Sequence, residues 1–421
     1  MTEITARETE KAVIVGLNAA SMGARDRSDD ETLDELEALL ETAGGECVGR
    51  VIQNRHTPDP RTFIGDGKTQ EVRELAENEG ATLVVFDNEL SPSQTRVLTE
   101  ELGVRVVDRS TLILDIFADR ASTREGRLQV ELAQYKYLLP RLTGMWGHLV
   151  RQTGTSAPIG TRGPGETQLE TDRRHIRRRI AKLEEELDEV IKVRATARRQ
   201  RQRNEIPVVA LVGYTNAGKS TLFNRLTGAG IHANDRLFDT LDTTTRRAAI
   251  NESSDALFSD TVGFIRKLPH HLVDAFRATL EELRYADLIL HVIDASNPQW
   301  QEQSRVTDEL IAQLVTPETP RIEVFNKCDL NSADIRPHGE NIVGISAITG
   351  SGIDELLYNI ESLLGLRVHR VTLRVPYAKS GVVDELYRAG FVTEVAYLDD
   401  FAEISAALDT RALNKYKEYT I

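Results

Sequence analysis

Residues 206–228 read IPVVALVGYTNAGKSTLFNRLTG and decide the fold of the central part of the chain. The apolar run at 206–212 is typical of a buried strand, and TLFNRLTG at 221–228 has the spacing of a helix that ends at glycine. Between them, Gly213–Ser220 match the pattern G-x-x-x-x-G-K-[ST], in which backbone N–H groups surround a phosphate. A loop of this kind between a strand and a helix predicts a phosphate-binding site at the edge of a parallel sheet.

Three further motifs follow, and each comes directly after a short apolar run that is typical of a strand. They are Asp260–Gly263 after DALFSD, Asn326–Asp329 after RIEVF, and Ser346–Ala347 after NIVGI. The carboxylate of Asp329 can accept hydrogen bonds from the N1–H and 2-amino groups of guanine, whereas adenine presents the wrong donor pattern. Because motifs at the carboxyl ends of neighbouring parallel strands meet in one crevice, the sequence predicts a GTP and GDP site in a doubly wound sheet.

The residues expected to bind the nucleotide lie in these four motifs, with Thr221 directly after the first. They are Gly213, Tyr214, Thr215, Asn216, Ala217, Gly218, Lys219, Ser220, Thr221, Asp260, Thr261, Val262, Gly263, Asn326, Lys327, Asp329, Ser346 and Ala347. Lys219 is expected to reach the β- and γ-phosphates, and the N–H of Gly263 can approach the γ-phosphate. Together with Thr244, these two residues form the expected catalytic set for hydrolysis of GTP to GDP and phosphate.

Magnesium is the cofactor that such a site requires, and three oxygen ligands are expected for it. Ser220 offers the hydroxyl of the phosphate-binding loop, and Asp260 offers the carboxylate that ends its strand. The threonine-rich segment LFDTLDTTTRR supplies the third ligand, for which Thr244 is the choice. Spacing does not exclude its neighbours Thr243 and Thr245.

The residue after Gly263 departs from the pattern of Ras-like enzymes, which have a glutamine there to orient the attacking water. This chain has Phe264, and a phenyl ring neither donates nor accepts the required hydrogen bond. We therefore expect slow intrinsic hydrolysis that another component completes. Asn216 offers one supplement, because its side-chain oxygen can help to hold K⁺ between the α- and γ-phosphates. The alternative is an asparagine that only stabilises the turn.

Outside the segment 206–366, which we assign to the GTPase domain, the sequence predicts three more domains. In residues 1–127, the runs KAVIVGL, ECVGRVI, ATLVVFD and GVRVVD alternate with segments of helical periodicity, which predicts a small parallel α/β domain. Residues 128–205 are expected to form an antiparallel helical hairpin, in which the first helix stops at Pro140 and a Gly- and Pro-rich loop precedes a long second helix. Residues 367–421 are expected to form a small α+β domain with strands near VTLRVPY and TEVAYLDD.

The net charge of −14 would disfavour a nucleic-acid partner if it were spread evenly. However, residues 173–203 contain 12 Lys or Arg and 5 Asp or Glu, and residues 141–165 contain three Arg and no acid. Arginine suits phosphate contacts, and Trp146 and His148 can stack on bases. This pattern predicts that residues 141–203 contact RNA. The alternative is a solvated helix whose arginines pair with the acids in its middle.

Composition also limits the compartment and the kind of chemistry. No apolar run reaches the length of a membrane span, and the first residues, MTEITARETEK, are polar where a signal peptide would be apolar. The two cysteines, Cys47 and Cys328, are too few and too far apart for a disulfide framework or a typical zinc site. We expect a cytoplasmic monomer without a membrane span.

Two other functions stay open on the residues alone. The stretch Gly65–Lys68 resembles a short phosphate loop, which would allow an RNA-remodelling NTPase with a second, N-terminal ATP site. It is shorter than a Walker A motif and lacks the following Ser or Thr, so a turn that begins a helix is favoured. The chain could also be a GTPase switch for protein partners, with the hairpin as the binding arm.

The segment RGPGETQLETDRR at 162–174 closely resembles the signature of the HflX family of ribosome-associated GTPases, and PDPRTFIGDGKTQEV, FDNELSPSQTR and DTVGFIRKLP extend the match. The resemblance covers most of residues 45–365. It implies an N-terminal HflX domain, a helical hairpin, a GTPase domain and binding to the large ribosomal subunit, which would stimulate hydrolysis. It also implies a role in ribosome splitting, rescue or quality control under stress. A hydrophobic residue at Phe264 fits the family pattern.

Overall fold

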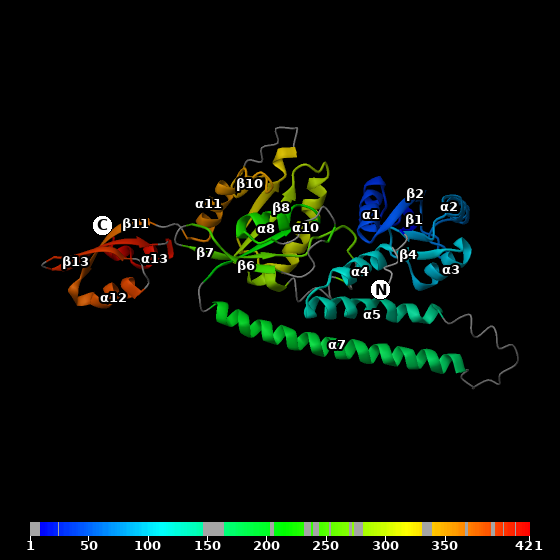
Figure 1. Cartoon of the computed structure of the whole chain (residues 1–421), viewed down its shortest axis with the longest axis horizontal. Helices are drawn as coiled ribbons and strands as arrows, with labels where there is room; N and C mark the ends of the chain where they lie inside the picture. The colour runs from blue at the N-terminus through cyan, green and yellow to red at the C-terminus, as the bar shows by residue number, and fades with distance from the viewer. Residues whose placement is uncertain are drawn as a thin grey trace, which may run out of the picture.

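The computed structural model describes residues 9–23, 25–145, 164–202, 206–230, 237–238, 244–251, 254–268, 272, 281–330, 339–366, 369–388, 392–398, 400–408 and 410–421. These residues form an N-terminal α/β domain, a helical hairpin, a central α/β domain and a small C-terminal domain (Figure 1). The predicted order of four parts is therefore confirmed.

The N-terminal domain is a parallel sheet with the strand order β2-β1-β3-β4. Its strands are β1 (Glu10–Ala19), β2 (Gly45–Arg55), β3 (Leu83–Phe86) and β4 (Arg105–Asp108). Its helices are α1 (Asp30–Thr42), α2 (Asp66–Glu79), α3 (Pro92–Leu102) and α4 (Arg109–Arg120). Local sequence signals set the helix ends, because Asp29 and Ser91 form capping boxes, and Gly80 and Gly103 take the left-handed conformation that ends a helix.

Both faces of this sheet are covered, which explains why its strands are apolar throughout. Ile14 and Val85 point to one face, where leucines of α1 and α4 pack on them. Val13 and Phe86 point to the other face, against Val72 of α2 and neighbouring residues of α3. The segment Gly65–Lys68 is the start of α2, with Gly65 as its N-cap, so the favoured interpretation of a turn and helix start is confirmed.

The hairpin consists of α5 (Arg124–Met145) and the long α7 (Pro164–Gln202), which run side by side in opposite directions (Figure 1). Leu128 and Leu132 of α5 pack against Leu183 and Leu187 of α7. The α5 helix also packs on α3 and α4, so the expected domain boundary at 127/128 falls inside a helix that serves both parts.

The prediction that the first hairpin helix stops at Pro140 is wrong. The α5 helix continues through Pro140 to Met145. Proline disturbs the hydrogen bonds of the preceding turn, and the guanidinium of Arg141 donates to one carbonyl there, that of Tyr137, at 3.2 Å. The same guanidinium lies 3.3 Å from the centre of the Tyr137 ring and donates to the carbonyl of Leu90 and to Asp108. The guanidinium of Arg141 is therefore engaged within the chain.

The central domain has a six-stranded sheet with the order β10-β9-β8-β5-β7-β6, in which only the edge strand β6 is antiparallel among these described strands. Its strands are β5 (Val208–Gly213), β6 (Thr244–Ala249), β7 (Asp255–Asp260), β8 (Leu288–Asp294), β9 (Arg321–Asn326) and β10 (Ile342–Gly344). Its helices are α8 (Lys219–Thr227), η1 (Glu281–Tyr285), α10 (Trp300–Leu314), η2 (Cys328–Leu330) and α11 (Ile353–Leu363). This is the doubly wound sheet that the motifs predict.

The two faces of the central sheet have separate cores. Phe223 of α8 and Ile360 of α11 pack on one face, together with Leu211 and Val324 of the strands. Ile311 of α10 packs on the other face with residues of η1 and β5. Helices therefore cover both sides and leave the carboxyl ends of the strands as the open edge.

The C-terminal domain is an antiparallel sheet of order β11-β13-β12, with helices on one side. Its elements are β11 (His369–Pro376), η3 (Tyr377–Lys379), α12 (Ser380–Arg388), β12 (Val392–Tyr397), β13 (Phe401–Leu408), α13 (Thr410–Lys415) and η4 (Lys417–Tyr419). The α+β prediction is confirmed, but the central strand β13 was not anticipated.

The N-terminal and central domains share one apolar cluster. Phe238 of the central domain packs edge-on against Phe117 of α4, with 4.7 Å between ring centres and 84° between planes. Tyr214, Val262 and Ile265 extend the cluster toward the phosphate-binding loop. The N-terminal domain therefore packs directly against the segments that surround the predicted site. None of the described helices, α7 included, has the length and apolarity that crossing a membrane requires.

Candidate active site

The predicted phosphate-binding loop connects β5 to α8 and depends on its two glycines. A Cβ on Gly213 would clash with the carbonyl oxygen of Val292 in the adjacent strand. Gly218 has φ +87°, and a Cβ there would clash with the side-chain nitrogen of Asn326. Asn216 between them is exposed with φ +60°, a conformation that asparagine tolerates better than most residues. The close approach of other strands therefore requires glycine at both ends of the loop.

Lys219 is buried at the start of α8, at 6% exposure. Its ammonium donates to the carbonyl of Tyr214 at 2.7 Å. Burial lowers the pKa of Lys219 to about 8, although the nearby carboxylate of Asp260 opposes the change. A bound polyphosphate would supply the negative charge that favours the protonated form.

Ser220 and Asp260, two of the expected magnesium ligands, are in direct contact. The hydroxyl of Ser220 donates to Oδ2 of Asp260 at 2.8 Å, and Asp260 is fully buried at the end of β7. Thr244 is paired with Asp260 across the β6–β7 ladder, so the two side chains share one face of the sheet. Thr245 points to the opposite face, where its hydroxyl lies 3.4 Å from that of Ser259. Thr243 lies outside the described residues.

Asn326 joins two loops that are far apart in sequence. Its side-chain nitrogen donates to the carbonyl of Ala217 at 2.9 Å, and its side-chain oxygen accepts from the N–H of Ala347 at 3.0 Å. The side chain is 2% exposed. Asn326 therefore fixes the phosphate-binding loop relative to the Ser346–Ala347 loop, which is the arrangement predicted for the guanine-binding end.

The neighbours of Asn326 complete this end of the site. Lys327 has φ +63°, and its ammonium pairs with Oδ2 of Asp294 at 2.7 Å. Asp329 is exposed in η2, where its carboxylate is available to a ligand. Ser346 is buried and its hydroxyl accepts from the N–H of Thr349 at 3.2 Å, which shapes the loop.

Two of the residues expected to touch the nucleotide turn their side chains inward. The hydroxyl of Thr261 donates to the carbonyl of Leu211 at 2.6 Å, inside the sheet. Val262 belongs to the apolar cluster shared with the N-terminal domain. Both residues can therefore contribute backbone groups to the site, while their side chains support the segment that carries Gly263.

Gly263 lies directly against the phosphate-binding loop. A Cβ at this position would be 2.9 Å from Lys219 Nζ and equally close to the Cα and Cγ2 atoms of Thr215. The next residue, Phe264, accepts from the N–H of Thr215 at 2.7 Å and donates to the carbonyl of Gly213 at 3.1 Å. Its ring is 2% exposed and lies in the core beneath β5 and β8. The phenyl group therefore points away from the phosphates.

Two supporting groups were missed by the sequence reasoning. Asp294 ends β8 and orients Lys327, and its other oxygen accepts from the N–H of Ser296 at 3.0 Å. An acid at the end of an apolar strand was the available signal for Asp294. Glu35 of α1 accepts a hydrogen bond from the hydroxyl of Tyr214, and no local pattern connects two residues so far apart in sequence.

These features together define a GTP-binding protein of the P-loop class: a strand–loop–helix motif with the predicted loop, a paired Ser220 and Asp260, and an Asn326 side chain that joins two loops at the same edge of the sheet. Family models match nearly the whole chain in the same order. They are described as GTP-binding GTPase N-terminal (residues 30–118), GTP-binding GTPase Middle Region (120–201), 50S ribosome-binding GTPase (208–327) and HflX C-terminal domain (334–415). The chain belongs to the HflX family of GTPases.

Individual relatives agree with the family models. The GTPase HflX of Caldanaerobacter subterraneus subsp. tengcongensis is 46% identical over 417 residues, covering 99% of this chain and 94% of that protein. The GTPase HflX of Escherichia coli strain K12 is 46% identical over 367 residues, or 86% of this chain and 85% of that protein. A crystal structure of a GTP-binding protein from Sulfolobus solfataricus in complex with GDP is 25% identical, with a TM-score of 0.44, and covers 85% of this chain and 99% of its own.

Proposed function

We propose that this chain binds GTP and Mg²⁺ at the carboxyl ends of β5, β7 and β9, hydrolyses GTP slowly, and binds the large ribosomal subunit in ribosome splitting, rescue or quality control. The observation that carries the proposal is the position of Asn326. Its side chain holds the phosphate-binding loop and the Ser346–Ala347 loop together, with the exposed carboxylate of Asp329 beside them. This geometry supports a guanine ligand whose phosphates end at Lys219.

The magnesium site consists of Ser220, Asp260 and Thr244 in this proposal. Hydroxyl and carboxylate oxygens suit Mg²⁺, and the 2.8 Å contact between Ser220 and Asp260 brings two of them together. We expect Thr244→Ala to raise the Mg²⁺ concentration needed for binding of a non-hydrolysable GTP analogue. Thr245→Ala is the matched control, because its side chain points to the opposite face. An unchanged Mg²⁺ requirement in Thr244→Ala would transfer the role to another hydroxyl, which Thr243→Ala tests first.

Asn216 is proposed to help hold K⁺ beside the phosphates. Its exposed position and its place between Gly213 and Lys219 support this role, whereas its φ of +60° supports the alternative of a turn residue. Hydrolysis rates in KCl and NaCl separate the two. Faster hydrolysis in KCl that disappears in Asn216→Ala supports the cation role, and equal rates in both salts contradict it.

The hairpin supports an RNA-binding role for its outer part. Arg174, Arg177 and Arg178 of α7 are exposed, whereas Arg179 is engaged in a two-bond pair with Glu131 of α5 at 2.8 Å. We propose that exposed arginines of α7, together with the segment 146–163, contact ribosomal RNA. Trp146 and His148 belong to that segment, which lies outside the described residues.

Co-sedimentation with large ribosomal subunits tests this proposal. We expect binding with a non-hydrolysable GTP analogue to exceed binding with GDP, and to fall steeply between about 50 and 200 mM salt as phosphate contacts are lost. Replacement of residues 146–163 by a short Gly-Ser linker should leave nucleotide affinity intact and abolish stimulation by the subunit. Salt-insensitive binding would favour a switch for protein partners. ATP hydrolysis that survives Lys219→Ala would favour the N-terminal NTPase.

A further inference from the structure

The hydroxyl of Tyr214 connects three parts of the molecule. Tyr214 lies in the phosphate-binding loop and is 5% exposed. Its hydroxyl accepts from the N–H of Arg266 at 2.7 Å and donates to the carboxylate of Glu35 in the N-terminal domain. Burial, and next the charge of Glu35, raises the pKa of Tyr214 well above its ordinary value, so the donor proton is retained. Tyr214 therefore binds the segment after Gly263 on one side and α1 on the other.

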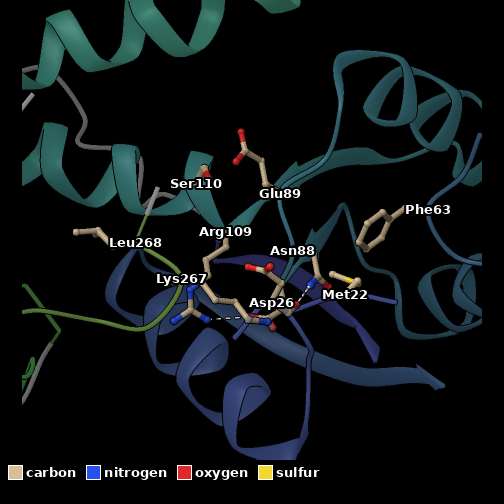
Figure 2. A pocket seen from close by; sticks show the side chains of 10 residues that line it. Met22, Asp26, Phe63, Asn88, Glu89, Arg109, Ser110, Lys267 and Leu268 are labelled. Carbon is tan, nitrogen blue, oxygen red and sulfur yellow. Dashed lines mark hydrogen bonds and ion pairs between the residues drawn. The ribbon is translucent and has the colours of Figure 1, made fainter. Parts of the chain in front are cut away.

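The segment after Gly263 is also anchored one residue further on. Lys267 has φ +52°, and its ammonium pairs with Asp87 and lies 3.2 Å from the hydroxyl of Ser28. Asp87 binds Arg109 at 2.8 Å, and Arg109 binds Glu35, so the connections form a closed ring. Figure 2 shows Lys267 and Arg109 extending together into a pocket of about 250 Å³ at the carboxyl ends of the N-terminal strands.

This closed ring of hydrogen bonds and ion pairs holds Gly263 close to the phosphate-binding loop. Main-chain bonds at Phe264 and the bond from Arg266 to Tyr214 hold this segment against the phosphate-binding loop. Gly263 consequently has no room for a methyl group on the side that faces Thr215 and Lys219, since a Cβ would be 2.9 Å from both residues. A γ-phosphate bound by both Lys219 and the N–H of Gly263 must lie between these two groups. Room for a third phosphate therefore requires Gly263 and the Lys219 ammonium to move apart, and the Thr215 backbone limits how much of this movement the loop can supply.

We propose that Tyr214, joined to Glu35, is a specificity-determining residue that biases the site toward GDP and against GTP. The inference rests on the proposed nucleotide site. A diphosphate ends before Gly263 and leaves the ring intact, whereas a triphosphate displaces Gly263 and strains the bonds of Tyr214. Because coupling between two equilibria is reciprocal, binding of GTP weakens the contact of Tyr214 and Lys267 with the N-terminal domain by the same factor.

The test compares the full chain with Tyr214→Phe, Glu35→Ala and the double variant. Dissociation constants are measured for fluorescent GDP and for a fluorescent, non-hydrolysable GTP analogue, both with Mg²⁺. The ratio of the constant for the analogue to that for GDP should fall about tenfold in each single variant, the lower end of the effect of a hydrogen bond to a charged group. The double variant should show little further change, since Tyr214→Phe removes the donor and Glu35→Ala removes the acceptor of the same bond. Tyr397→Phe, at an exposed tyrosine of the C-terminal domain, should leave the ratio unchanged.

The outcomes distinguish this inference from the nucleotide site itself. An unchanged or increased ratio in Tyr214→Phe, with both nucleotides still bound, overturns the role of Tyr214 and leaves the GTP site standing. Additive effects in the double variant overturn the inference that Tyr214 and Glu35 act through one shared hydrogen bond. Failure of the unaltered chain to bind either nucleotide overturns the proposed function. If Tyr214→Phe does not fold, Glu35→Ala decides the question alone.

Discussion

Replacement of Phe264 by glutamine should destabilise the central domain without accelerating hydrolysis. Glutamine at this position would restore the residue that orients water in Ras-like enzymes. The ring of Phe264, however, is 2% exposed among Val212, Ile289 and Ile311, on the side of the sheet that faces α10. A glutamine there would occupy the core. Its amide would point away from the phosphates, because the main-chain bonds of this residue to Gly213 and Thr215 fix its direction.

The expected loss of stability follows from the phenyl group that is removed and the amide group that is buried in its place. Truncation of a buried phenylalanine to alanine costs about 3–5 kcal/mol, and the methylene groups of glutamine recover part of this loss. A buried amide without a partner adds about 1–3 kcal/mol. We therefore expect Phe264→Gln to lower the free energy of unfolding of the central domain by about 3–5 kcal/mol. Phe264→Leu, which keeps an apolar side chain, should cost about 1–2 kcal/mol.

Denaturant unfolding with excess GDP and single-turnover hydrolysis of GTP provide the two measurements. Ile265→Ala is the comparison variant at the neighbouring residue. Ile265 faces the cluster shared with the N-terminal domain, so its truncation should loosen the contact between the domains and leave the core around Phe264 intact. The hydrolysis rate of folded Phe264→Gln should stay within about threefold of the unaltered chain. A rate increase of about tenfold or more, with unchanged stability, would refute the reasoning, because it would place the side chain at the phosphates.

Two further predictions test the base-recognition end and the ring of charges. Asp329→Asn should shift the preference from guanine to xanthine nucleotides by about 10³-fold or more, since the amide presents a donor to the N1–H of guanine. Competition between GTP and XTP for the site measures this preference, and a retained preference for GTP would contradict the prediction. Burial alone would raise the pKa of Asp87, but the charges of Arg109 and Lys267 outweigh burial and lower it. Its contribution to stability is therefore full above about pH 4 and lost as pH falls through the lower, folded-state pKa. The difference in unfolding free energy between the chain and Asp87→Asn should shrink below about pH 4, and a constant difference from pH 7 to pH 3 would contradict this.

Much of the fold could be predicted because its signals are local. The loop around Lys219 needs a strand before it and a helix after it, and both are legible in IPVVALV and TLFNRLTG. The same holds for Asn326, whose partners Ala217 and Ala347 belong to motifs of fixed order. Each of these residues ends a parallel strand or lies in the segment that follows one, so topology alone brings them to one edge of the sheet.

What escaped prediction depends on partners distant in sequence. The α5 helix continues through Pro140, and the side chain of Arg141 bonds to the carbonyl of Tyr137 in the preceding turn; helix propensity describes neither feature. The bond from Tyr214 to Glu35 crosses 179 residues. The expected slow hydrolysis rested on the chemistry of Phe264, but only the packing shows that its ring is part of the core.

The long helix α7 has a length that would magnify a small rotation at one of its ends. Its 39 residues span about 58 Å, while the 22 residues of α5 span about 33 Å, so one helix is a rod and the other its shorter support. The Gln202 end of the rod is separated by only a few residues from β5, which carries the phosphate-binding loop. A tilt of about 5° at that end would carry the Pro164 end about 5 Å. A small rotation beside β5 would therefore become a displacement of several ångströms at the Pro164 end of α7.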